Sequence, residues 1–164
     1  MNVDITKIAN VILYMLHKKV EHLNDKKVAI MLFLMDYNHQ KFCGKKIFNE
    51  EYIKSARNPE PHLISELFDV IANEEDLDEE DPRLFLIQEF LDYLDIEVVE
   101  KKNFIELKFI KMEEDFDESI FDKDEITTIH KIVSLYKDSS PRNIANVCFK
   151  IDEVRATQNG ELII

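Results

Sequence analysis

Residues Lys26–Asp69 read KKVAIMLFLMDYNHQKFCGKKIFNEEYIKSARNPEPHLISELFD, and they open with eight apolar residues in a row, Val28–Met35. Such a run is too continuous for the apolar stripe of a surface helix and far shorter than the roughly 20 residues that cross a membrane. A buried strand is the competing interpretation. Because Met, Leu and Ala favour helices, the run predicts a buried helix over Asp25–Phe42, with Asn24 as its N-cap and Gly44 as its stop.

The segment after this helix alternates short apolar pieces with turn residues. Lys45–Phe48 reads as a short strand and Glu51–Lys54 as its returning partner. Asn58–Pro61 contains two prolines and is expected to break the chain and start a helix over Pro61–Ala72. The first residue of this break, Asn58, can adopt the left-handed conformation that usually needs a glycine.

The flanking sequence predicts further helices, each with one apolar face. They are expected at Asp4–Glu21, after Asp81-Pro82, from Asp122 to about Lys137, and after Ser140-Pro141. Asp122 and Glu125 have the spacing of a capping box, and Ser140 is an N-cap before a first-turn proline. The acidic stretch Asn73–Asp81 is predicted to be an exposed loop because its carboxylates repel one another.

The residues Ile96–Met112 have the composition of a β-hairpin. An isolated hairpin is marginally stable, so we expect it to join the Lys46 and Tyr52 strands in one small antiparallel sheet. A second hairpin is expected at Gln158-Asn159-Gly160. The fold class is therefore predicted as mainly α (α+β), a compact helical domain of about six helices with a small antiparallel β element. One domain covers residues 1–164.

Charge and composition exclude several kinds of partner. The chain has 21 basic and 34 acidic residues, a net charge of −13, with 45% hydrophobic residues. This balance disfavours nucleic acid and anionic membranes as main ligands, and a basic protein is its natural electrostatic complement. An acidic surface that serves only solubility is the alternative. The sequence shows neither a leader peptide nor a membrane-spanning run, so we expect a cytoplasmic protein.

Motifs for cofactor and metal binding are missing from the sequence. With two glycines in the chain, phosphate-binding loops of the GxxxxGK or GxGxxG type cannot be present. The five histidines have no zinc-ligand spacing, and the acidic stretch lacks the central glycine of a calcium loop. We therefore expect no metal and no cofactor.

One group of side chains would allow covalent catalysis. Cys43 follows His39 by one helical turn, and Asp36 is available to orient the imidazole. A free cysteine is more commonly a small buried hydrophobe. The sequence thus favours a protein that is not an enzyme, with a cysteine hydrolase as the alternative.

Aromatic residues are frequent within Lys26–Asp69. Packing in the core is the favoured interpretation. Phe48 and Tyr52, next to the expected hairpin, are candidates for exposed anchors of a protein partner, since aromatic residues are enriched in interface cores.

The order of these parts resembles the Panacea domain, the antitoxin SocA-like family. The residues that carry the resemblance are Lys27–Leu34, Gly44-Lys45-Lys46-Ile47, Tyr52, Asn58–Pro61, Leu67-Phe68-Asp69, Glu125, Tyr136-Lys137-Asp138 and Ser140-Pro141. The chain departs from the family pattern in several places. Asn58 and Glu60 replace a glycine and a valine, a family histidine falls on Cys148 or Phe149, and the aromatic after it falls on Arg155.

The resemblance implies an antitoxin that neutralises a separately encoded toxin by direct binding. A family member that delivers its toxin to a protease implies a proteolytic adaptor as a variant. A phage or mobile-element accessory protein that binds a host factor is the other alternative. The expected partner-binding residues are Phe48, Tyr52, Asn58, Pro59, Glu60 and Pro61, together with the Asn73–Asp81 loop.

Overall fold

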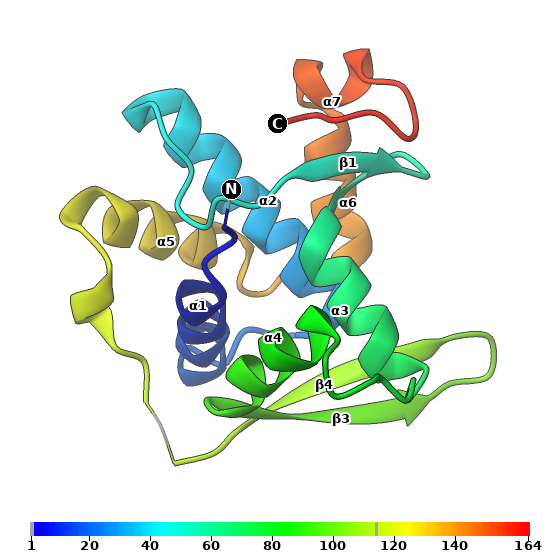
Figure 1. Cartoon of the computed structure of the whole chain (residues 1–164). Helices are drawn as coiled ribbons and strands as arrows, with labels where there is room; N and C mark the ends of the chain where they lie inside the picture. The colour runs from blue at the N-terminus through cyan, green and yellow to red at the C-terminus, as the bar shows by residue number, and fades with distance from the viewer. Residues whose placement is uncertain (1, 114) are drawn as a thin grey trace.

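The helix α2, Asp25–Cys43, runs through the middle of the molecule with other elements around it (Figure 1). The computed structural model describes residues 2–113 and 115–164. Nearly all side chains from Lys27 to Asp36 are buried, which confirms the predicted buried helix. Asn24 accepts a hydrogen bond from the Lys27 N–H as the N-cap, and Gly44 ends the helix with a left-handed φ of 82°.

Six further α-helices lie within the described residues. They are α1 (Ile5–His17), α3 (His62–Ala72), α4 (Pro82–Leu91), α5 (Lys123–Tyr136), α6 (Pro141–Phe149) and α7 (Asp152–Ala156). The predicted N-cap Ser140 and the Asp122–Glu125 capping box are confirmed, and Asp4 is the N-cap of α1. The short helix α7 was not expected, because the sequence predicts Val154–Thr157 as the first limb of the C-terminal hairpin.

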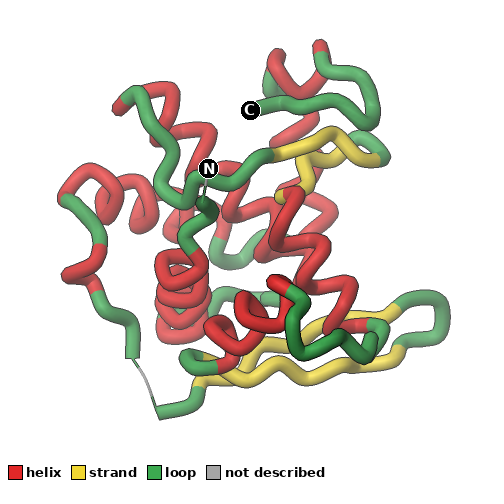
Figure 2. The backbone as a smooth tube through the Cα atoms, viewed as in Figure 1, coloured by secondary structure: helices red, strands yellow, loops and turns green. Residues whose placement is uncertain are grey.

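The strands form two separate antiparallel sheets of two strands each (Figure 2). In the first, β1 (Tyr52–Ser55) pairs with β2 (Asn58–Pro61). In the second, β3 (Leu94–Glu100) pairs with β4 (Ile105–Lys111). The predicted α+β class and the Ile96–Met112 hairpin are confirmed, whereas the prediction of one shared sheet is wrong.

The segment Lys45–Phe48 is not a strand, contrary to the sequence prediction. The Asp36 carboxylate accepts the N–H groups of Ile47 at 2.6 Å and Phe48 at 3.0 Å. The Phe48 carbonyl accepts the N–H of Asp4 at 2.9 Å. These backbone groups are therefore hydrogen-bonded to other parts of the fold and are not available to pair with β1.

The C-terminal residues extend the first sheet instead of forming their own hairpin. Tyr52 N–H donates to the Ile164 carbonyl at 2.9 Å, and Ile163 N–H donates to the Tyr52 carbonyl at 2.7 Å. Leu162 forms a bridge with Ile53. The outer edge of β1 is thus covered, and β1 lies between β2 and the C-terminal tail.

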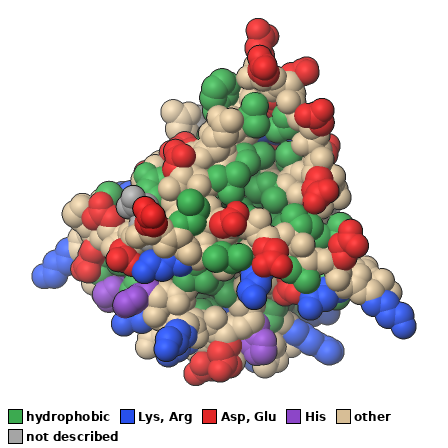
Figure 3. Space-filling view, turned by 90° about the horizontal axis from the view of Figure 1, so that it is seen from below, with side chains coloured by type: hydrophobic (Ala, Val, Ile, Leu, Met, Phe, Trp, Pro, Cys, Tyr) green, Lys and Arg blue, Asp and Glu red, His purple; other side chains and the backbone are tan. Residues whose placement is uncertain are grey.

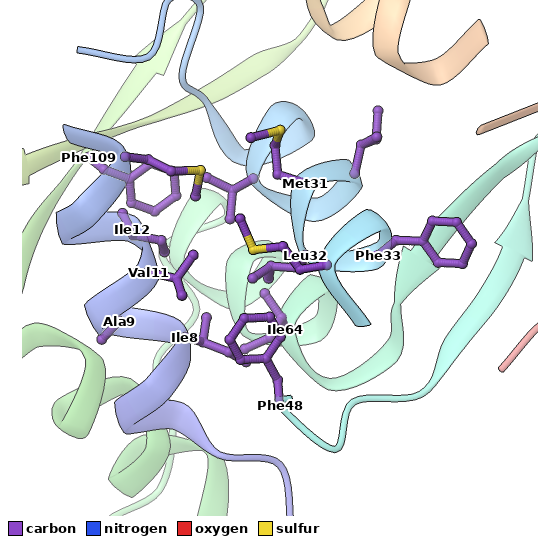
Figure 4. Close-up of a cluster of buried hydrophobic side chains, with 14 of the residues drawn as sticks. Ile8, Ala9, Val11, Ile12, Met31, Leu32, Phe33, Phe48, Ile64 and Phe109 are labelled. Carbon is purple, nitrogen blue, oxygen red and sulfur yellow. The ribbon is translucent and has the colours of Figure 1, made fainter. Parts of the chain in front are cut away.

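The core forms where α1 and α2 meet (Figure 4). Ile8 and Ile12 of α1 face Leu32 of α2, and Phe109 of β4 closes the cluster at one end. All four side chains are at most 3% exposed. Burial of large apolar side chains of this kind contributes about 1.5–3 kcal/mol each, so this contact is a major source of stability.

Candidate partner-binding groove

The strand β2 places its prolines where an N–H would have no partner. Hydrogen-bonded positions alternate along each strand of an antiparallel pair. His62 N–H donates to the Glu51 carbonyl at 2.8 Å, so by alternation Glu60 and Asn58 are the β2 residues that bond to β1. The two prolines occupy the other positions, and no N–H is left unpaired where β2 lies against α2. The residues predicted to break the chain therefore form an edge strand.

The two residues of the turn between β1 and β2 have left-handed backbone conformations. Ala56 has a φ of 47° and Arg57 a φ of 79°. Two central residues with positive φ are what a type I′ hairpin turn requires. Asn58 belongs to β2 and is not among the residues with positive φ, so its predicted left-handed conformation is wrong.

Phe48 and Tyr52 are buried, each 0% exposed, and the prediction that they are exposed anchors is wrong. The Tyr52 hydroxyl donates to Asp36 at 2.7 Å, and its ring packs edge-on against Phe33 of α2. Burial raises the pKa of the Tyr52 hydroxyl well above its usual value. Tyr52 therefore attaches β1 to α2, and both aromatic side chains belong to the core and are not accessible to a partner.

The N-terminus of α3 is capped by a residue from outside the helix. The residue before α3 is Pro61, which provides no side-chain cap. The buried Glu50 carboxylate instead accepts the N–H groups of Ile64 at 2.9 Å and Leu63 at 3.3 Å. Burial raises the pKa of Glu50, and these backbone hydrogen bonds oppose the rise. Glu50 thus fixes α3 relative to β1 and β2.

A groove of about 750 Å³ opens beside this assembly. Its walls come from the start of α2, from β2 and α3, from the loop between β3 and β4, and from the start of α6. Among the predicted partner-binding residues, Asn58, Pro59 and Glu60 line it. Pro61 is buried outside the groove, and no residue of the Asn73–Asp81 loop lines it.

The groove combines apolar walls with four carboxylates. Ile30, Pro59 and Phe68 are buried and Phe104 is exposed at the rim. The carboxylates that line it are Asp25, Glu60, Asp69 and Glu106. Its basic residues are Lys26 and Arg142. The volume lies in the range of ligand pockets, and negative charge exceeds positive charge.

The carboxylates of the groove repel one another. Burial raises the pKa of Asp69, and the charges of Glu60 and Asp25 raise it further. Burial likewise raises the pKa of Asp25, with a contribution from Glu106. Asp25 accepts the Leu107 N–H at 3.1 Å. Across the described residues, no hydrogen bond or ion pair joins the side chain of Glu60 or of Asp69 to another residue. A cation in the groove would relieve this repulsion.

A smaller basic pocket of about 250 Å³ adjoins the groove at Asn58. Arg57 and Arg142 line it, and the Arg57 guanidinium lies 4.1 Å from the centre of the Phe149 ring. The tip of the hairpin therefore borders a basic pocket, and Arg142 lines both this pocket and the acidic groove.

A second exposed apolar area lies on the underside of the molecule (Figure 3). Hydrophobic side chains gather there among charged ones. Among the exposed apolar side chains of the described residues, Ile110 of β4 and Met112 just after it are 38% and 51% exposed. Single exposed apolar residues are common on protein surfaces, so this area is a weaker candidate than the groove.

Cys43, His39 and Asp36 are not arranged as a catalytic triad. Asp36 binds two backbone N–H groups and the Tyr52 hydroxyl, and it forms no hydrogen bond with His39. The buried His39 donates from Nδ1 to the Lys45 carbonyl at 2.6 Å, while Cys43 is exposed. Within residues 2–113 and 115–164, no three His, Cys, Asp or Glu side chains are placed to hold a metal. The helices described there are all too short or too polar to cross a membrane.

Sequence reasoning identified part of the groove. Glu60 and Pro59 were predicted from their turn-like context, and Asp69 belongs to the Leu67-Phe68-Asp69 segment that carries the family resemblance. The sequence context of Asp25 indicates only the start of a helix. No local sequence pattern marks Phe104 and Glu106 as groove residues, because they reach the groove through the tertiary packing of the β3–β4 hairpin.

The fold is a mainly helical domain with two small antiparallel sheets and a groove beside β2. The family model described as "Antitoxin SocA-like, Panacea domain" matches residues 30–152. Because this match covers most of the chain, the protein belongs to the Panacea family of antitoxin SocA-like domains. No curated protein and no solved structure matches the chain.

Proposed function

We propose that this protein neutralises a cognate toxin by binding it directly, as the antitoxin of a cytoplasmic toxin–antitoxin system. The observation that carries the proposal is the family match over residues 30–152. The groove beside β2 supports it, because this hollow of about 750 Å³ is lined by three of the predicted partner-binding residues.

In this proposal, Asn58, Pro59 and Glu60 contact the toxin, and buried Phe48, Tyr52 and Pro61 hold the hairpin in place. The net charge of −13 favours a basic surface on the toxin. Neutralisation follows from occlusion, since a toxin surface seated in the groove cannot reach its target.

Co-expression tests the proposal. The protein is produced together with the product of the neighbouring reading frame, and growth and co-purification are measured. We expect rescued growth and a stable complex. Absence of both would refute the antitoxin function and would favour a mobile-element accessory protein that binds a host factor.

A strain without ATP-dependent proteases distinguishes direct neutralisation from delivery of the toxin to a protease. Occlusion predicts that growth rescue persists and that the toxin accumulates as a complex. Loss of rescue in that strain would instead identify a proteolytic adaptor.

We also propose that neutralisation is independent of catalysis. Cys43 is exposed and no hydrogen bond within the described residues joins it to the buried His39, so Cys43→Ala is expected to leave growth rescue and complex formation unchanged. A toxin that is modified covalently by the wild-type protein and not by this variant would contradict the proposal.

A further inference from the structure

The apolar part of the groove determines what kind of segment fits it. Ile30 of α2 and Phe68 of α3 are 5% and 4% exposed, and Pro59 of β2 lies between these helices in sequence. Phe104 extends from the loop between β3 and β4 and is 48% exposed. Walls of this composition bind apolar side chains or the aliphatic stem of a lysine or arginine.

The carboxylates select the charge of the occupant. Glu60 and Asp69 have no ion-pair partner within the described residues, although both line the groove. Their repulsion with Asp25 is released when a cation binds between them. A cation at a partly desolvated site of this kind interacts more strongly than at an open surface.

The rim already shows how a cation contacts the groove. The ammonium group of Lys26 lies 4.8 Å from the centre of the Phe104 ring. This is a cation–π geometry, in which the ring face attracts positive charge. Lys26 is on the first turn of α2 and its side chain is exposed, and no ion pair within the described residues joins it to Glu60 or Asp69.

We infer that the groove binds a basic segment of the partner protein in which lysine or arginine residues alternate with apolar residues. The cationic groups lie among Asp25, Glu60 and Asp69, and the apolar residues pack against Phe68 and Pro59. This inference rests on the proposed function for the identity of the partner, and charge complementarity selects the segment. A free polyamine is disfavoured because it would leave the apolar walls without a partner.

Charge reversal in the groove tests the inference in the complex. The double variant Glu60→Lys/Asp69→Lys reverses two groove carboxylates whose side chains make no hydrogen bonds in the described structure. The control Asp92→Lys/Glu97→Lys makes the same change in net charge at two exposed residues outside both the groove and the Asn73–Asp81 loop. We expect the groove variant to raise the Kd for the toxin at least 30-fold and the control to raise it less than threefold. Equal effects, or no effect in the groove, would overturn the inference.

A peptide probe separates this inference from the proposed function. The probe is an acetylated nonapeptide of alternating lysine and leucine, with a glutamate–leucine peptide as its control, and spermidine is tested alongside. Amide chemical shifts of the labelled protein are expected to change near Glu60, Asp69 and Phe104 with the lysine peptide alone, and the groove variant is expected to abolish the changes. Shifts centred on Asn73–Asp81, or equal shifts with spermidine, would overturn the inference even if the protein neutralises a toxin. Shifts in the groove without toxin neutralisation would refute only the proposed function.

Discussion

At the scale of single residues, Asp36 connects the central helix to the segment that follows it. Its two oxygens accept hydrogen bonds from the Ile47 and Phe48 N–H groups and from the Tyr52 hydroxyl. The side chain is 0% exposed, and burial raises its pKa to about 6. One buried carboxylate thus sets the path of the chain from the end of α2 to β1.

The variant Asp36→Asn tests this role through pH. Between the ordinary pKa of 3.8 and about 6, the folded protein binds more protons at Asp36 than the unfolded chain does. The free energy of unfolding therefore falls as pH rises through this window and becomes independent of Asp36 above it. Asparagine keeps the acceptor for the two N–H groups and can donate to the Tyr52 oxygen, but it does not titrate.

Urea unfolding of both proteins from pH 4 to pH 7 measures the effect. The wild-type protein is expected to lose on the order of 2–3 kcal/mol relative to Asp36→Asn over this range. Parallel stability curves, or a difference that grows in favour of the wild type with rising pH, would show that Asp36 is not a buried titrating group.

Ala56 occupies a backbone conformation that suits other residues better. Its φ of 47° lies in the left-handed region, which asparagine tolerates and alanine does not favour. We expect Ala56→Asn to raise the free energy of unfolding by about 0.5–1 kcal/mol. The same substitution at the exposed helical residue Ala156 is the control and should lower stability slightly. A loss of stability at both positions would refute the turn assignment.

At the scale of elements, α3 depends on a cap that is distant in the sequence. Glu50 accepts two N–H groups of the first turn of α3, 13 and 14 residues further along the chain. Its carboxylate also complements the positive end of the helix.

Replacement of Glu50 measures the value of this cap. We expect Glu50→Ala to lower the free energy of unfolding by about 1–3 kcal/mol, because buried donors lose their acceptor. Glu50→Gln keeps one acceptor and should lose roughly half as much. Glu51→Ala, at an exposed neighbour with no side-chain hydrogen bond in the described structure, should change stability by less than about 0.5 kcal/mol. Similar effects of Glu50→Ala and Glu51→Ala would contradict the capping role.

The elements differ in how well local sequence predicts them. The helix α2 is predictable because its apolar run, Asn24 cap and Gly44 stop are adjacent in the sequence. The partner strand of β1 is not predictable from local sequence, because the N–H groups of Ile47 and Phe48 donate to Asp36, which lies 11 and 12 residues earlier. Local pattern identifies a strand, but tertiary hydrogen bonds decide which segments can pair.

In the candidate site too, local sequence predicts some residues, and tertiary packing alone determines the others. Pro59 and Glu60 are recognisable from a proline-rich segment with a charge in it. That both prolines belong to a strand becomes clear only from the register with β1. Glu106 and Phe104 reach the groove through the packing of a separate hairpin, and nothing in their local sequence marks them.

At the scale of the whole molecule, the net charge of −13 predicts how fast a basic toxin is bound. Long-range attraction accelerates encounter, and salt screens it over about 8–10 Å at physiological concentration. We expect the association rate to fall at least fivefold between 50 and 300 mM salt, with a smaller change in the dissociation rate. Stopped-flow binding measures both rates. An association rate that is insensitive to salt would argue against electrostatic steering.

The central proposal also concerns the whole molecule: this Panacea-family domain binds a toxin in the groove beside β2. Hydrogen exchange of the protein alone and in complex with the toxin tests it directly. The proposed function predicts slower exchange in the complex for residues 55–60, at the hairpin, and 101–106, at the β3–β4 loop, both of which border the groove. Protection confined to the end of β4 around Ile110 and Met112, with no change at those two segments, would contradict it.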